Sequence, residues 1–309
     1  MLRYFLTKGG TFLLSLWIVL TITFFFMHAI PGDPFLGDHP IPREVMQTLH
    51  AYYGLDLPLT HQYFFYLKRI ATLDLGCSIL YPGKTVVELI REGWSSSAIL
   101  GLQALCLAIP GGVLLGLWTA LKKNSRQDTT ILILCAIGVS LPSFILASLL
   151  QWTFCLKLHW FPIAYWGTWL HTVLPTLALA AMPTAYIARL TRARLSEVLE
   201  EHYIQTAKAK GLPMLRIAYR HGFRSALLPV VAYLGPATSH LVMGSLMIEK
   251  IFSIPGLGKW MISSIAARDY PMILGLTLFF SFFLMLSNFL VDIIYGLMDP
   301  RIRASKEYE

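Results

Sequence analysis

Charged residues are scarce in this chain. Only 14% of its 309 residues are Asp, Glu, Lys or Arg, whereas 56% are hydrophobic; soluble proteins carry roughly a quarter charged residues. Too few charges are present to cover the surface of a 34.8 kDa globule, which argues against a soluble enzyme. The same composition excludes a disordered chain and a fibrous repeat. We therefore expect this chain to fold in a bilayer.

Cysteine clusters and catalytic motifs are also missing. The four cysteines have no metal-type spacing, and apolar packing is their default role. No Gly-x-x-x-x-Gly-Lys-Ser/Thr loop is present to hold ATP phosphates, and neither is a His-Glu-x-x-His or Gly-x-Ser-x-Gly motif. We therefore expect a non-catalytic chain that binds no cofactor and no metal itself, which counts against an intramembrane enzyme.

Long apolar runs dominate what is present. A membrane-spanning helix needs about 20 mostly apolar residues, and six segments qualify: 9–30, 98–121, 130–156, 170–188, 226–248 and 271–298. The first run is longer than the roughly 7–15 residues of a signal-peptide core, so we expect it to be retained. Internal prolines predict kinked helices; they are Pro110, Pro142, Pro175, Pro183, Pro229 and Pro236. The predicted fold class is an all-α integral membrane protein with six transmembrane helices.

The basic residues behind the net charge of +8 are unevenly distributed between the two sides of the predicted membrane. With a cytoplasmic N-terminus, 16 of the 25 Lys and Arg residues lie on the inner side, as the positive-inside rule requires. Membrane topology rather than nucleic-acid binding then accounts for the basic balance. We expect both termini to be cytoplasmic, and membrane lipid rather than nucleic acid to surround the chain. We divide the chain into an N-terminal segment with the first helix (1–30), an extracytoplasmic loop (31–97) and a core (98–309) whose cytoplasmic loop is 189–225.

That cytoplasmic loop carries the strongest local signal. It is polar and basic, and it predicts a short helix with small residues at Ala207 and Ala209, followed by a stop at Gly211 and Pro213. Small side chains would let another protein approach the helix closely. The alternative is an amphipathic helix lying on anionic lipid, and composition alone leaves both open.

Polar residues inside the predicted spans form a second group of candidates. Asp292 is the only acidic residue within a predicted span, with Asn288 one turn before it and Tyr295 one turn after it. Ionisable groups at membrane depth are often functional. Because Asp292 lies near the end of its helix, the alternative is an interfacial or packing hydrogen bond. We predict intramembrane polar contacts for all three residues.

The cytoplasmic loop resembles the "EAA" loop of ATP-binding-cassette (ABC) importer permeases, although Gln205 and Thr206 depart from its usual letters. Other stretches resemble the peptide/nickel branch of these permeases in order along the chain: 31–34 (Pro-Gly-Asp-Pro), 53–59, 74–76, 252–258, 268–271 and 299–303. One departure is residues 94–97, Trp-Ser-Ser-Ser, where this branch often has Leu-Pro-Ala-Thr.

The resemblance implies a type I ABC-importer permease (MetI-like) fold in the bacterial cytoplasmic (inner) membrane. It implies four kinds of partner besides lipid: a homologous second permease subunit, two cytoplasmic ATP-binding subunits that use ATP and Mg, and an extracytoplasmic solute-binding protein. Peptides are the implied cargo. An alternative is that the same machinery imports nickel or another small solute. A second hypothesis is that the chain is an ion-coupled secondary transporter.

The resemblance also implies roles for particular residues. The ATPase-coupling loop comprises Gln205, Thr206, Ala207, Gly211, Leu212 and Pro213. A rim for docking of the binding protein comprises Pro255, Gly256 and Gly258. The alternative for this rim is a plain turn flanked by Trp260 as an interfacial anchor.

Overall fold

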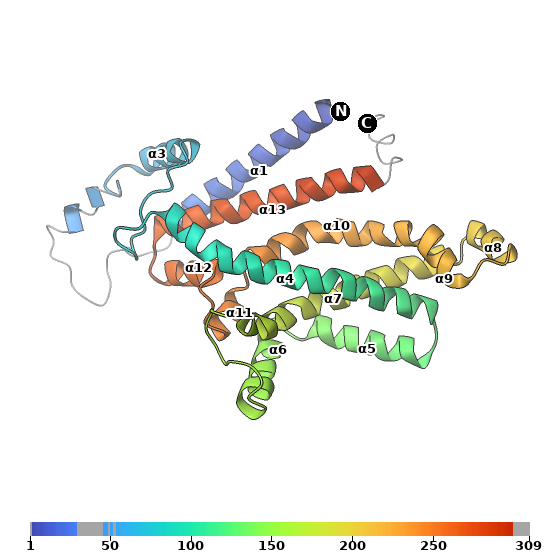
Figure 1. Ribbon diagram of the computed structural model, residues 1–309. Helices are drawn as coiled ribbons and strands as arrows, with labels where there is room; N and C mark the ends of the chain where they lie inside the picture. Colours follow the sequence, from blue (N-terminus) through green and yellow to red (C-terminus); the bar gives the residue numbers. More distant parts are fainter. Residues whose placement is uncertain (1, 30–45, 49, 52–53, 299–309) are drawn as a thin grey trace. The chain divides into compact units, whose positions relative to one another are not determined.

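The computed structural model describes residues 2–29, 46–48, 50–51 and 54–298, and these residues are helical apart from turns, loops and one isolated bridge between Cys77 and Thr85 (Figure 1). The chain divides into two compact units. Unit 1 comprises Met1–Ser96 and Pro255–Phe283, and unit 2 comprises Ser97–Ile254 and Leu284–Glu309. Two long helices, α4 (Val86–Leu121) and α13 (Tyr270–Met298), contribute to both units.

Within the described residues, five helices are long and apolar enough to cross a bilayer: Gly9–Ala29, Val86–Leu121, Leu170–Val198, Phe223–Ile251 and Tyr270–Ile294. A sixth candidate is a bent pair of helical segments, Arg126–Ser140 and Ser143–Lys157. Each predicted apolar run thus has a helical counterpart. The second begins earlier than predicted, because the helix already starts at Val86.

The predicted span 130–156 is not one continuous helix, which corrects the sequence prediction. Helix α5 (Arg126–Ser140) ends before Pro142. The next segment, α6 (Ser143–Leu150) continued by the π-helix η1 (Gln151–Lys157), is bent by 103° relative to α5. Proline removes a backbone donor and forces the preceding residue out of the α region; Leu141 accordingly adopts φ −77° and ψ 121°. Helix α5 alone is about 22 Å long, shorter than the apolar core of a bilayer.

Unit 1 contains α1 (Leu2–Ala29), α3 (Leu59–Ala71), α12 (Leu257–Ala266) and parts of α4 and α13. A buried carboxylate organises it. Asp269 precedes α13 and accepts a hydrogen bond from the backbone N–H of Met272 at 3.2 Å, as an N-cap does. The same side chain accepts hydrogen bonds from Ser78 Oγ and, at 3.1 Å, from the Leu80 N–H. Asp269 therefore joins two segments that are far apart in the chain.

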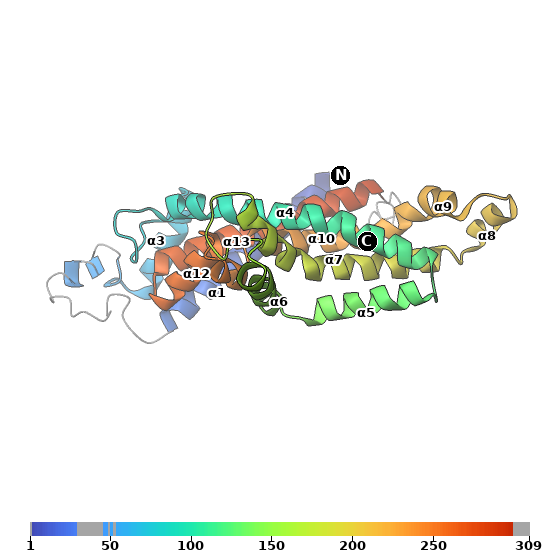
Figure 2. The ribbon, with the colours of Figure 1, turned by 60° about the horizontal axis from the view of Figure 1, so that its bottom comes forward.

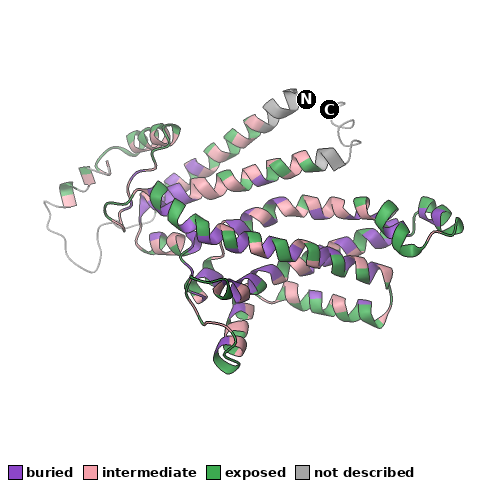
Figure 3. Cartoon of the chain, in the orientation of Figure 1, coloured by how far each residue is buried: buried purple, intermediate pink, exposed green. Residues whose placement is uncertain are grey.

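Unit 2 is built around α7 (Leu170–Val198), which is buried along much of its length (Figure 3). Figures 1 and 2 show α5 and α10 (Phe223–Val242) running beside α7, and both helices contact it. The unit also holds three short helices and a second π-helix: α8 (His202–Ala209), α9 (Met214–Ile217), η2 (Ala218–Gly222) and α11 (Leu246–Ile251).

Helix α4 lies against α7 through two glycines four residues apart. A Cβ at Gly116 would lie 2.5 Å from Thr191 Cβ, and a Cβ at Gly112 would lie 2.7 Å from Ile187 Cβ. Small residues at this spacing are typical of membrane helices whose backbones approach closely. The contact sets the end of α4 beside the end of α7, where the candidate functional loop begins.

Candidate functional site

The cytoplasmic-loop candidate corresponds to α8, α9 and η2, which lie beyond the ends of α7 and α10 within unit 2 (Figure 1). One side of α8 is buried: Ile204 is fully buried, and Ala207 is 9% exposed. They belong to an apolar cluster, here called the α8 cluster, which takes residues from α4, α7, α8, α9 and α10. Its buried members are Ala120, Leu195, Val198, Leu199, Ile204, Ala207, Ile217 and Ala226.

The two faces of α8 therefore differ: one packs within unit 2, and the other is exposed. Ala207 packs within the chain, so its small size lets α8 seat on its own unit rather than leaving room for a partner. Gln205, Thr206 and Ala209 are exposed, as are the lysines that flank Ala209. A partner that docks on α8 would meet this polar, basic face.

The end of α8 is fixed by a local backbone motif. Gly211 has φ +77°, and its N–H donates to Lys208 O at 2.9 Å. The Leu212 N–H donates to Ala207 O at 3.4 Å, and the Leu212 side chain packs on the α8 cluster. These two bonds and this apolar contact define a Schellman C-cap. Pro213 follows with φ −65° and precedes α9. The predicted helix stop at Gly211 and Pro213 is confirmed.

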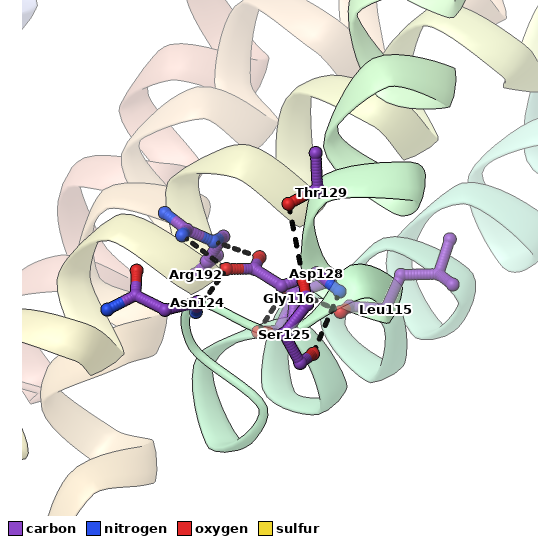
Figure 4. A network of polar contacts seen from close by, with 8 residues as sticks. Leu115, Gly116, Asn124, Ser125, Asp128, Thr129 and Arg192 are labelled. Atoms are coloured by element: carbon purple, nitrogen blue, oxygen red, sulfur yellow. Dashed lines mark hydrogen bonds and ion pairs between the residues drawn. The ribbon is translucent and has the colours of Figure 1, made fainter.

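An ion pair between a buried carboxylate and a partly exposed guanidinium lies at the base of this loop (Figure 4). Asp128, near the start of α5, is 2% exposed and accepts hydrogen bonds from Arg192 Nε at 2.6 Å and Arg192 Nη2 at 2.7 Å. The Asn124 N–H donates to the same carboxylate at 3.0 Å, and Asn124 itself has φ +65°. Ser125 caps α5 by accepting from the Asp128 N–H at 3.2 Å. The turn after α4 is thereby attached to α7.

A second ion pair joins the same two segments at the surface. Lys123 Nζ lies 2.5 Å from Glu200 Oε1, and the two side chains are 43% and 69% exposed. The hydrogen bond from Lys123 lowers the pKa of the Glu200 carboxyl below its ordinary value. Because both groups are well solvated, this pair contributes little to stability.

The predicted rim residues divide between surface and interior. Pro255 is exposed, whereas Gly256 is buried before α12 and Gly258 is buried inside α12. Trp260 packs inside unit 1: a Cβ at Gly93 would lie 2.5 Å from its Cδ1, and Tyr81 contacts its ring edge-to-face at 4.9 Å. Of the three predicted rim residues, only Pro255 presents a surface in this structure.

The predicted intramembrane polar residues lie on α13. Asn288 is exposed. A Cβ at Gly235 of α10 would lie 2.5 Å from its Oδ1, so the Asn288 amide packs against Gly235 where a larger residue would have its side chain. Asp292 is half-buried and has an interaction partner. Tyr295 lies in α13, and its side chain lies outside the described residues.

Two functional candidates were missed by sequence reasoning. Glu249 in α11 is fully buried and accepts a hydrogen bond from Ser97 Oγ at 2.7 Å. The predicted span 226–248 ends one residue before Glu249, which places Glu249 in a predicted loop. Asp128 was missed for the same reason, although the Ser-x-x-Asp cap pattern at 125–128 signals a helix start. Ser97 belongs to residues 94–97, the stretch that differs from the usual Leu-Pro-Ala-Thr. Its hydroxyl forms the hydrogen bond to Glu249 within unit 2.

Helix α8 thus combines an exposed polar face with an opposite face that is packed on the α8 cluster. The exposed side chains of α8 include Gln205, Thr206 and Lys208, which can form hydrogen bonds with a docked partner.

Comparison with known proteins covers both ends of the chain. Residues 112–304 match the family model described as "Binding-protein-dependent transport system inner membrane component", and residues 1–77 match its N-terminal companion model. The chain is 45% identical over 307 residues to the dipeptide transport system permease protein DppB of Bacillus subtilis (strain 168), covering 99% of this chain and 100% of the relative.

Two further relatives are similar over almost the same length. The oligopeptide transport system permease protein OppB of Escherichia coli (strain K12) is 41% identical over 305 residues, covering 98% of this chain and 100% of the relative. The dipeptide transport system permease protein DppB of Lactococcus lactis subsp. cremoris (strain MG1363) is 38% identical over 303 residues, with the same two coverages.

Proposed function

Because the chain belongs to the family of binding-protein-dependent transport system inner membrane components, we propose that it forms half of the pore of an ABC importer for dipeptides or oligopeptides. It is a non-catalytic, multi-pass inner-membrane permease subunit. The peptide cargo is supported by the full-length similarity to relatives whose names specify dipeptide and oligopeptide transport.

The proposed topology has six spans in a type I importer permease (MetI-like) fold, with the bent α5–α6–η1 segment as the third span and both termini in the cytoplasm. Residues 31–97 then form the extracytoplasmic loop, and 189–225 lie in the cytoplasm within the core 98–309. The concentration of basic residues in 189–225 supports this orientation.

The observation that carries the coupling proposal is α8 itself, seated on the α8 cluster and ended by the C-cap at Gly211. In the proposed complex this helix docks into one of two cytoplasmic ATP-binding subunits through its exposed face at Gln205 and Thr206. ATP and Mg bind on those subunits and not on this chain. A homologous second permease completes the pore, and a solute-binding protein docks on the extracytoplasmic side near Pro255.

Transport then follows from a rigid-body movement. When ATP draws the two ATP-binding subunits together, the paired coupling helices move with them and the spans rock between inward-facing and outward-facing states. A few kcal/mol of differential binding is enough to change which state predominates. Because α8 is seated on α4, α7, α9 and α10, its displacement reaches several helices at once.

Reconstitution tests the proposed function. The chain is co-expressed with its second permease and ATP-binding subunits, purified as a complex and inserted into liposomes, and ATP-dependent uptake of a labelled dipeptide is measured with the binding protein present. Omission of ATP or of the binding protein should abolish uptake. Uptake by this chain alone without ATP would instead identify a secondary transporter, and uptake of Ni²⁺ but not of dipeptides would replace the cargo.

A further inference from the structure

We propose that the Asp128–Arg192 ion pair is a positioning device that makes α4, α5 and α7 move together with α8, and that it sets how much peptide is transported per ATP hydrolysed. This inference rests on the proposed function and names residues that no comparison assigns. Arg192 lies in the cytoplasmic loop 189–225, but neither residue is among the predicted ATPase-coupling residues between Gln205 and Pro213 or in the α8 cluster.

The placement of the pair is the first argument. The α8 cluster joins α8 to the last turn of α4 through Ala120 and to the last turns of α7 through Leu195 and Val198. The ion pair is next to this cluster along the chain. Arg192 precedes Leu195 by about one turn on α7, and Asp128 lies in the first turn of α5, the helix that follows the turn after α4. The cluster and the ion pair therefore hold neighbouring parts of one platform beneath α8.

The geometry of the pair is the second argument. Apolar packing is not directional, so the α8 cluster resists separation of the helices better than sliding between them. A guanidinium that donates two parallel hydrogen bonds to one carboxylate fixes both distance and orientation. The third hydrogen bond, from the Asn124 N–H, extends this constraint to the turn between α4 and α5.

Stability does not account for a pair at this position. Removing the Asp128 carboxylate and most of the Arg192 guanidinium from water is costly, and well-packed apolar residues often stabilise a protein as much as such an ion pair does. An ion pair does, however, specify one arrangement of the elements it joins. Helices that transmit the displacement of α8 need a fixed arrangement, because sliding between them would absorb the movement.

The chain provides two matched controls. Lys123–Glu200 joins the same α4–α5 turn to the end of α7 but is exposed, and Arg194–Glu197 is exposed at 2.9 Å within α7 alone. If any ion pair near α8 were sufficient, all three would matter equally. We expect only the pair with the buried Asp128 carboxylate to affect coupling.

The experiment uses the full reconstituted complex. Asp128→Asn, Arg192→Met and Arg192→Lys are compared with Lys123→Gln and Arg194→Gln. Three quantities are measured: the amount of assembled complex, the ATPase rate with and without loaded binding protein, and the peptide transported per ATP. Asp128→Asn and Arg192→Met should lower peptide per ATP by about tenfold, a typical size for coupling between two sites. Arg192→Lys should give an intermediate value, because it keeps the charge without the fork.

The outcomes separate the possible explanations. If Asp128→Asn lowers only the amount of complex and leaves peptide per ATP unchanged, the pair is merely structural and the proposal is wrong. If a single variant fails to assemble, the double variant Asp128→Asn/Arg192→Met removes the orphaned buried charge and is measured in its place. Equal losses in the Lys123→Gln control would also overturn the proposal. Failure of the wild-type complex to couple ATP hydrolysis to dipeptide uptake would instead contradict the proposed function.

Discussion

Substitution of Gly211 should uncouple the importer through the backbone alone. Gly211 has φ +77°, and a Cβ built there would have no neighbouring atom within 4 Å. Steric contact with the rest of the chain therefore contributes nothing, and only the left-handed conformation matters. For residues other than glycine this conformation costs about 1–2 kcal/mol, with Asn the best tolerated and β-branched residues the worst.

A penalty near 2 kcal/mol for Gly211→Val corresponds to a change of up to roughly 30-fold in the equilibrium between the native C-cap and alternative conformations. Once the cap is lost, Leu212 no longer holds the exit from α8 against the α8 cluster. We therefore expect dipeptide uptake by the reconstituted complex to fall in the order Asn, Ala, Val at position 211. The loss should appear in peptide transported per ATP more than in the amount of assembled complex.

Gly83 provides the matched control, because its φ is +84° and it too has no atom within 4 Å of a built Cβ, yet it lies in unit 1. Gly83→Val carries the same backbone penalty away from α8 and should leave peptide per ATP unchanged. Equal effects of Gly211→Val and Gly83→Val, or normal transport by Gly211→Val, would refute the reasoning.

Three further predictions concern packing and buried polar groups. Ala207→Glu should strongly reduce the amount of purified permease, because it places a charge in the α8 cluster; Ala209→Glu on the exposed side should leave the amount of permease unchanged but copurify less ATP-binding subunit. Gly116→Leu should destabilise the chain by about 1–3 kcal/mol or more through overpacking against α7, measured by thermal unfolding in detergent, and an unchanged midpoint would contradict the close approach of α4. Ser97→Ala should cost about 1–3 kcal/mol in the same assay by removing a hydrogen bond to buried Glu249, whereas Ser97→Thr should retain it.

Much of the fold was predictable because its signals are local. The apolar runs are recognisable from transfer free energy alone. Five of them match candidate membrane-spanning helices, and the run 130–156 matches a bent pair of helical segments. The end of α8 was also predictable, since Gly211 and Pro213 act within their own turn. The resemblance of scattered short motifs to importer permeases agrees with the family match.

The prolines show where local reasoning fails. Five prolines lie inside continuous helices, whereas Pro142 ends one helix and begins another at 103°. The residue type is the same in all six cases. What differs is whether the helix continues through the proline or ends before it, and the proline by itself does not decide between these outcomes.

The candidate site divides in the same way. By itself the sequence determined that the chain spans a membrane, that 189–225 is a basic stretch, and that a short helix ends at Gly211, because hydropathy, charge and φ preference belong to a segment. Only the tertiary structure decided that Ala207 faces inward, that Ser97 bonds to Glu249, and that Asp128 pairs with Arg192. These depend on which helix faces meet, and a contact between residues 64 or 152 positions apart leaves no periodic trace in the chain.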